Sequence, residues 1–137
     1  MGTQTLELHL LSGELAVCRL EPGEPWPEWA QGPGLVAVIR TAEELSVICP
    51  APRVPPGVER VEGWRALRVA GPLDMSAVGV LAGLSGCLAR AGVSLLALST
   101  FLTDYVLVRR ADLGRALAAL GAGGYRLVGE SGELRRT

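Results

Sequence analysis

The sequence predicts an α+β protein built from two small modules in tandem, each centred on a β-sheet. Two observations lead to this expectation. The second half of the chain alternates strands and helices in the order β-α-β-β-α-β, and the first half repeats part of that pattern without a long helix. The chain has 137 residues, of which 49% are hydrophobic, so it holds enough apolar material for a compact core.

The second half, residues 63–137, carries the clearer pattern. Residues 64–70 are expected to form a strand. In residues 75–91 apolar side chains recur every three or four positions, which predicts a helix that ends at Gly92. The buried face of this helix is expected to carry Val78, Leu81, Leu84, Leu88 and Ala91. The remaining elements of this ferredoxin-like order are strands at 93–98, 105–108 and 125–128 and a helix at 111–120 that ends at Gly121.

The first half, residues 1–62, is expected to be a degenerate module whose first helix is reduced. In residues 5–20 leucines alternate with polar residues, which predicts a β-hairpin that turns at Ser12 and Gly13. Residues 21–34 are rich in Pro and Gly and are expected to hold at most one helical turn, at 27–30. Two further strands are expected at 35–40 and 45–49. The proline-rich residues 50–57 cannot continue a central strand and are expected to cross between the modules.

An internal repeat supports the assignment of two related modules. A shift of 59 residues places VAVIRTAEELSVI on LLALSTFLTDYVL, so that Thr41 falls on Thr100 and Val47 on Val106. Each segment reads as a strand, a polar turn that contains Thr, and a second strand. The turn in the second copy has no Gly, Asn or Pro, the residues that turns usually employ.

The composition argues against several classes of protein. The formal net charge is −1 and no basic block occurs, which argues against nucleic-acid binding. The three cysteines are widely spaced and accompany one histidine, so we expect no zinc site and no cofactor. The amino terminus resembles no signal peptide, and the longest uncharged run, residues 75–89, is too short to cross a bilayer. We therefore expect a cytoplasmic protein. No catalytic motif is found, and the protein is expected not to be an enzyme.

Three motifs carry a resemblance to a known family. They are G-P-L-D-x-S-x-x-G at residues 71–79, A-G-V-S-x-x-x-L-S-T-F-x-T-D-Y-x-L-V at 91–108, and T-x-E-E-L-S-V-I-C-P at 41–50. Together they resemble ACT domains, the small βαββαβ modules that bind amino acids and regulate metabolic enzymes. More narrowly, the chain is similar to bacterial stand-alone tandem-ACT proteins, to the cytosolic arginine sensors and to the regulatory part of aspartate kinases.

The resemblance implies a ligand site between ACT modules. The glycine-containing loop before the first helix and the turn of the second hairpin hold the ligand in the sensors. By position this implies Asp74, Met75, Ser76, Ala77, Val78, Gly79, Thr100, Phe101 and Asp104. Thr41, Glu43 and Glu44 are the matching candidates in the first module. Ala77 stands about where the sensor loop has an acidic residue, so the identity of the amino acid stays open.

Each candidate also has a structural interpretation. Asp104 is expected either to pair with the α-amino group of a ligand or to make a local hydrogen bond in the turn. The amides at the start of the helix suit a ligand carboxylate, although Asp74 or Ser76 is expected to cap the same helix. Thr100 is a ligand contact or an ordinary strand residue. Phe101 is a ligand lid, a dimer contact or a core residue.

The expected function is that of a regulatory sensor. In this interpretation the protein binds an amino acid or a similar small zwitterion at a module interface, acts as an allosteric regulator and forms a homodimer. Glu43 and Glu44 either mirror Asp104 or begin a helix. The alternative is an interaction module of the same fold that binds no metabolite and acts through a partner enzyme.

Overall fold

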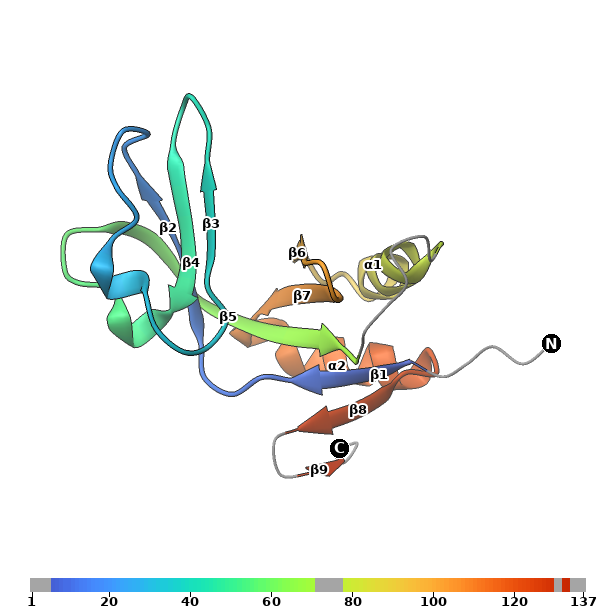
Figure 1. The fold of residues 1–137 in the computed structure, drawn as a ribbon. Coiled ribbons are helices and arrows are strands. Elements are labelled where there is room, and N and C mark those ends of the chain that lie inside the picture. Colours follow the sequence, from blue (N-terminus) through green and yellow to red (C-terminus); the bar gives the residue numbers. More distant parts are fainter. Residues whose placement is uncertain (1–5, 71–77, 130–131, 134–137) are drawn as a thin grey trace. The chain divides into compact units, whose positions relative to one another are not determined.

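The chain folds into two compact units, seen in a computed structural model that describes residues 6–70, 78–129 and 132–133 (Figure 1). Unit 1 consists of residues 1–12 and 65–137, and unit 2 consists of residues 13–64. Unit 2 is therefore inserted into unit 1 in the sequence. This differs from the expected linear division into 1–62 and 63–137, because the first strand belongs with the second half of the chain.

Unit 2 is an antiparallel sheet with the ferredoxin-like strand order. It contains β2 (Leu15–Leu20), β3 (Ala37–Arg40), β4 (Leu45–Pro50) and the first part of β5 (Glu59–Val69), in the order β3-β4-β2-β5. Two single turns of 3-10 helix, η1 (Glu28–Ala30) and η2 (Ala51–Arg53), stand where the two helices of such a module would lie. The expected reduction of the first helix is confirmed, and the second helix is reduced as well.

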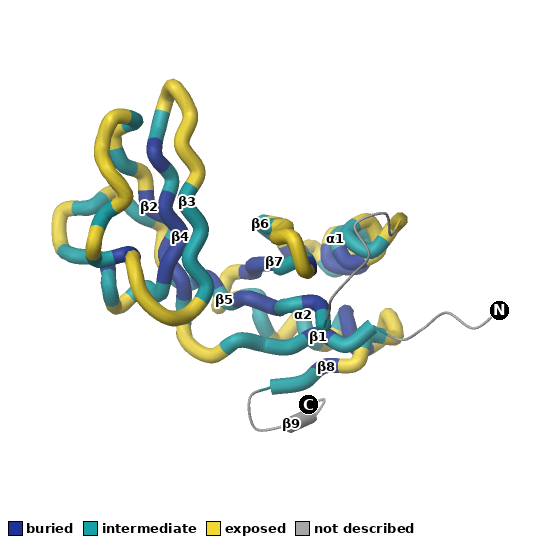
Figure 2. The backbone as a smooth tube through the Cα atoms, in the orientation of Figure 1, coloured by how far each residue is buried: buried dark blue, intermediate teal, exposed yellow. Residues whose placement is uncertain are grey.

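The core of unit 2 lies on one face of its sheet. Figure 2 shows buried positions along β2 and β4, and the fully buried side chains include Cys18, Leu45, Val47 and Cys49.

In the same unit, Arg60 fixes the proline-rich connection that precedes β5. Its guanidinium donates hydrogen bonds to the carbonyl oxygens of Val54 and Pro55, at 3.0 and 2.8 Å. The arginine thus supplies the partners that a loop without ladder hydrogen bonds lacks.

Within unit 1 the sheet has two strands more than the four of the ferredoxin-like pattern. Its strand order is β6-β7-β5-β1-β8-β9, with helices α1 and α2 in the connections. The bounds are β1 (Glu7–Leu10), β6 (Leu95–Ser99), β7 (Asp104–Arg109), β8 (Arg126–Gly129), β9 (Gly132–Glu133), α1 (Val80–Arg90), η3 (Arg110–Asp112) and α2 (Leu113–Ala122).

The additional strands are β9, which pairs with β8, and β1, which lies inside the sheet. Strand β1 lies between β5 and β8, antiparallel to the first and parallel to the second. The predicted hairpin of residues 5–20 is therefore wrong, since β2 pairs instead with β4 and β5. Insertion of β1 buries Leu8, which is 1% exposed, in the core of unit 1. The edges of β5 and β8 that face β1 thereby gain hydrogen-bond partners.

Helix α1 begins later than the spacing predicts. Its N-cap is Gly79, with φ of +85°, a left-handed conformation that does not belong to a helix. Val78 is consequently 95% exposed and not on the buried face, while Leu84 and Leu88 are buried as expected. The end at Gly92, with φ of +74°, is confirmed. The predicted end of α2 is wrong by two residues, since the helix continues through Gly121 to Ala122.

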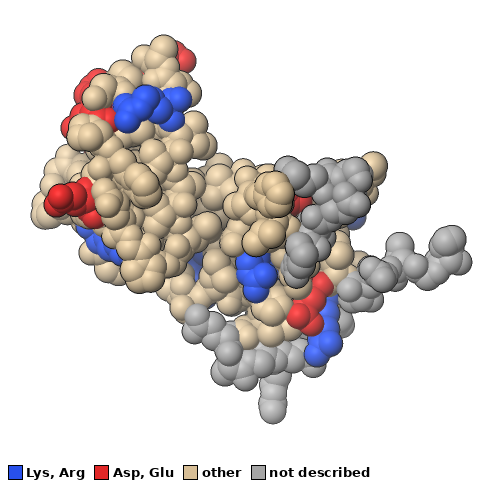
Figure 3. Space-filling view, viewed as in Figure 1, with Lys and Arg blue, Asp and Glu red and all other residues tan. Residues whose placement is uncertain are grey.

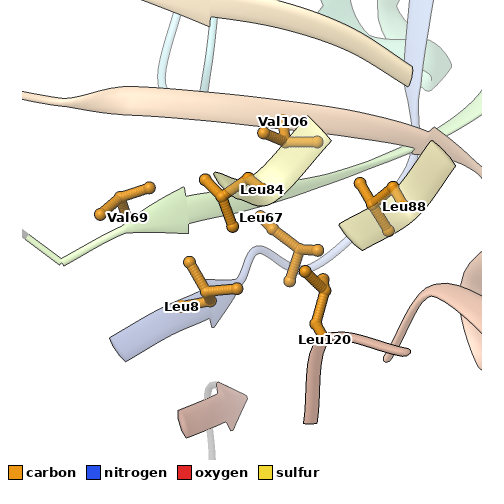
Figure 4. Close-up of a pocket in the computed structure, with 7 residues that line it drawn as sticks. All are labelled: Leu8, Leu67, Val69, Leu84, Leu88, Val106 and Leu120. Carbon is orange, nitrogen blue, oxygen red and sulfur yellow. The ribbon is translucent and has the colours of Figure 1, made fainter. Parts of the chain in front are cut away.

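The core of unit 1 lies between the sheet and its two helices. Figure 4 shows seven of its side chains, which come from three strands and both helices. They are Leu8, Leu67, Val69, Leu84, Leu88, Val106 and Leu120. The spaces among them are too narrow to hold a water molecule. This region is a packed core and not a ligand cavity.

Candidate functional site

The turn between β6 and β7 closes on its own threonines. Ser99 and Asp104 face each other across the strand pair, and the amide of Thr100 donates to the carbonyl of Thr103 at 2.8 Å. The amide of Thr103 donates to Oγ1 of Thr100 at 3.2 Å, and that hydroxyl donates to the carbonyl of Thr103 at 3.1 Å. The side chain of Thr100 therefore closes the turn by hydrogen bonds to the backbone of Thr103, which explains why no Gly or Asn is needed.

Thr103 connects this turn to the end of β5. Its hydroxyl donates to the backbone carbonyl of Val69 at 2.7 Å. Thr103 is 6% exposed and is the one buried polar residue in the part of the chain that the structure describes. Sequence reasoning missed it. The available signal was a β-branched residue with a hydroxyl group inside an otherwise polar and exposed turn.

The tip of the turn presents two apolar side chains to solvent. Phe101 is 78% exposed and Leu102 is 60% exposed. The interpretation of Phe101 as a core residue is therefore wrong. An aromatic ring held at the tip of a tight turn suits contact with a ligand or with another protein.

Asp104 occupies a half-buried position at the first residue of β7. Its Oδ1 accepts a hydrogen bond from the hydroxyl of Ser99 at 2.7 Å, so the expected local hydrogen bond is present. Its Oδ2 has no hydrogen-bond partner among the described residues. The carboxylate is thus oriented by one oxygen and can accept a hydrogen bond from a ligand through the other.

Unit 2 contains the same turn between β3 and β4. The amide of Thr41 donates to the carbonyl of Glu44 at 2.9 Å, and the amide of Glu44 donates to Oγ1 of Thr41 at 3.2 Å. The strand register also repeats with the shift of 59 residues, because Arg40 faces Leu45 as Ser99 faces Asp104. The internal repeat seen in the sequence is therefore a repeat in backbone geometry.

The side chains of the two turns differ. Glu43 is exposed in unit 2, and Oε1 of Glu44 accepts a hydrogen bond from Ser46 at 2.6 Å. The interpretation in which Glu43 and Glu44 begin a helix is wrong, because they lie in a hairpin turn. Phe101 and Leu102 stand in unit 1 at the positions of Ala42 and Glu43.

The loop candidates fall mostly outside the described residues. This holds for Asp74, Met75, Ser76 and Ala77. The following Gly79 is the N-cap of α1 and has no side chain that could cap the helix. The expected cap by Asp74 or Ser76 lies outside the described residues. The first amides of a helix generally favour an anion.

Other reactive groups do not add chemistry to this turn. Burial raises the pKa of the Cys18 thiol to about 11, and the neighbouring Cys49 adds to this shift. Burial also raises the pKa of Cys49. Among the described residues, no three His, Cys, Asp or Glu side chains gather as a metal site would require. Within the same residues, no helix has the length and apolar character needed to cross a membrane.

Comparison with known proteins identifies the two units separately. Residues 59–122, which begin at β5, match the model of the ACT domain family. Residues 13–57, which lie within unit 2, match a second family model that describes an N-terminal domain. No curated protein matches the sequence significantly.

Solved structures with the same fold include three informative relatives. Protein Atu0741 from Agobacterium tumefaciens is 31% identical, with a TM-score of 0.88, and the match covers 97% of this chain and 99% of that chain. Protein VC0802 from Vibrio cholerae, described as a possible transport protein of unknown function, is 21% identical, with a TM-score of 0.72 and coverage of 88% and 91%. The regulatory subunit of aspartate kinase from Thermus flavus is 12% identical, with a TM-score of 0.60 and coverage of 88% and 97%.

The fold and the repeated turn define a protein of two related ferredoxin-like modules with the architecture of a regulatory domain. Residues 59–122 belong to the ACT domain family, and the chain is related in fold to the regulatory domains of aspartate kinases.

Proposed function

We propose that this protein is a regulatory sensor that binds an amino acid at the β6–β7 turn of unit 1. The observation that carries the proposal is the half-buried carboxylate of Asp104, which is oriented by Ser99 and whose Oδ2 has no hydrogen-bond partner within residues 6–70, 78–129 and 132–133. A charge-assisted hydrogen bond from an α-amino group to such a carboxylate contributes roughly 1.5–3 kcal/mol.

The remaining groups of the site have complementary tasks. The hydroxyl of Thr100 already donates and accepts within the turn, so this residue holds the turn in shape and contacts a ligand secondarily. The exposed ring of Phe101 offers apolar surface to the ligand side chain. The first turn of α1, with the loop at 74–79, is assigned to the α-carboxylate, because the first amides of a helix favour an anion.

The proposal includes a second copy of the chain. Among the described strands β6 pairs only with β7, so no described strand pairs with the other edge of β6. The strand β6 contains no charged residue. Such an edge is suited to strand pairing between copies, which would bring two modules together beside the β6–β7 turn. Fold relatives that are regulatory subunits of aspartate kinase support a regulatory role in kind.

A screen of thermal melting against the twenty amino acids tests the proposal. A ligand present at a hundred times its Kd stabilises the folded state by about 2.7 kcal/mol, which raises the Tm by several degrees. We expect one or two amino acids to do so. A protein whose Tm responds to none of them would contradict the proposal.

The exposed pair at the tip of the turn favours one other candidate function. Phe101 and Leu102 also suit direct contact with a partner enzyme, with no metabolite involved. Under that alternative no amino acid changes the Tm, and Phe101→Ala weakens the binding of the partner.

A further inference from the structure

A group of charged side chains lies on the face of the unit 1 sheet that is turned away from the helices. Successive side chains of a strand point to opposite faces. Because Leu8, Leu67 and Leu127 point into the core, their neighbours on β1, β5 and β8 point to the other face. These neighbours are Glu7, His9, Arg68 and Arg126.

Glu7 is the acidic member of this group and is shared by two bases. Its Oε1 lies 2.6 Å from Nε2 of His9, and its Oε2 lies 3.6 Å from Nε of Arg126. Both carboxylate oxygens are therefore engaged. Figure 3 shows blue and red side chains interspersed over the visible face of the molecule, with no broad patch of one sign. An anion site among the side chains visible in this view would accordingly be local.

Arg68 has no counter-charge among the residues that the structure describes. It stands directly opposite His9 in the antiparallel pair of β1 and β5, so the two Cβ atoms are about 4.5–5.5 Å apart. It is half-buried, and it forms no hydrogen bond or ion pair with any residue that the structure describes. A guanidinium group in such a position normally has a partner, because withdrawing a charge from water is unfavourable unless the charge is paired.

We propose that Arg68, beside His9, forms a binding site for a small oxyanion, a phosphate or carboxylate group, on this face of the sheet. The planar guanidinium binds two oxygens of such a group at once. Arg126 adds positive charge on the other side of Glu7, which limits the repulsion that Glu7 exerts on the anion. The site is independent of the amino-acid site proposed at Asp104, because it uses none of the same residues.

Isothermal titration calorimetry with inorganic phosphate tests this site in the full chain. The titration is run in chloride buffer of constant ionic strength and at low-millimolar phosphate, where general exclusion of the salt from the protein surface is small. We expect saturable binding to the unmodified protein. Arg68→Gln should weaken it by about tenfold or more, since the charge-assisted pair is lost.

Two matched variants make the comparison specific. Arg115→Gln removes an exposed arginine of α2 that pairs with Asp112 at 2.7 Å, and it should leave phosphate affinity unchanged. Arg68→Lys keeps the charge but not the planar guanidinium, so it should bind phosphate with intermediate affinity. This variant replaces Arg68→Gln in the comparison if Arg68→Gln does not fold. A parallel titration with succinate separates the two sources: saturable binding of either anion supports the site and identifies its preferred group. Binding of neither anion, or equal loss in the Arg68 and Arg115 variants, would overturn it.

Discussion

The hydroxyl of Thr103 donates to the carbonyl of Val69 across 34 positions of sequence, at 2.7 Å. This bond joins the turn that carries Phe101 and Asp104 to the end of β5, just before the segment that leads to α1. The turn of the proposed amino-acid site is therefore tied to β5. Because the bond is buried, it both stabilises unit 1 and sets the position of the turn.

Replacement of Thr103 should reveal this dual role. Thr103→Val keeps the shape but leaves the Val69 carbonyl without its partner, which should cost about 1–3 kcal/mol of unfolding free energy. Thr103→Ser keeps the hydroxyl and should retain most of the stability. Urea denaturation measures both values. Equal losses in the two variants would show that the methyl group, and not the hydrogen bond, matters.

The repeated turn predicts matched effects in the two units. Thr100→Ala and Thr41→Ala each remove the hydroxyl that accepts backbone amides in its own turn. Each should lower the unfolding free energy by about 0.5–1.5 kcal/mol. The double variant should show the sum, because the two turns share no partner. If only one of the two variants lowered the unfolding free energy, the threonine hydroxyls would not stabilise the two turns equally, and the prediction would be wrong.

Gly79 and Gly114 should respond in opposite directions to alanine. An added Cβ meets no atom within 4 Å at either position, so packing does not enter the comparison. Gly79 has φ of +85°, and Gly79→Ala should cost about 1–2 kcal/mol. Gly114 lies within α2, and Gly114→Ala should stabilise by up to about 1 kcal/mol. Thermal melting of both variants gives the two signs, and destabilisation by Gly114→Ala would contradict this account.

The buried thiols predict a loss of stability at alkaline pH. The pKa of Cys18 is raised from 9.0 to about 11 in the folded protein, so the unfolded chain loses this proton at lower pH. The contribution of Cys18 is complete below pH 9.0 and is lost as the pH rises towards about 11. Cys18→Ala should reduce the dependence of unfolding free energy on pH in this window. An unchanged pH dependence would contradict it.

The reactivity of the thiols provides a second observation on the same groups. Cys18, Cys49 and Cys87 are free and buried. A thiol reagent at neutral pH should modify them slowly in the native protein and rapidly in urea, because the reactive thiolate is scarce and inaccessible. Rapid modification of the native protein would show that the cores open frequently.

Local patterns in the sequence predicted most elements but not their partners. The spacing of Leu84 and Leu88 was sufficient for α1, because helical periodicity is a property of neighbouring residues. Alternation likewise identified β1 and its buried Leu8. It could not show that β1 pairs with β5 and β8, since strand partners are set by packing between distant segments.

The candidate site shows the same limit. Thr100 and Asp104 were predicted because the motif of this turn resembles that of ACT domains, and their hydrogen bonds lie within the same turn. Thr103 was missed because its partner, Val69, lies far away in the sequence. The start of α1 was misplaced because Val78 continues the apolar spacing, while the left-handed conformation of Gly79 interrupts the helix.

The most direct test of the central claim compares ligand binding by Asp104→Asn and Asp112→Asn, using the amino acid that raises the Tm most. Asp112 is a carboxylate of the same unit that pairs with Arg115, away from the β6–β7 turn in sequence. We expect Asp104→Asn to weaken binding at least about tenfold while the Tm without ligand stays nearly constant, and Asp112→Asn to bind as the unmodified protein does. Unchanged affinity in Asp104→Asn would contradict the placement of the ligand at this turn.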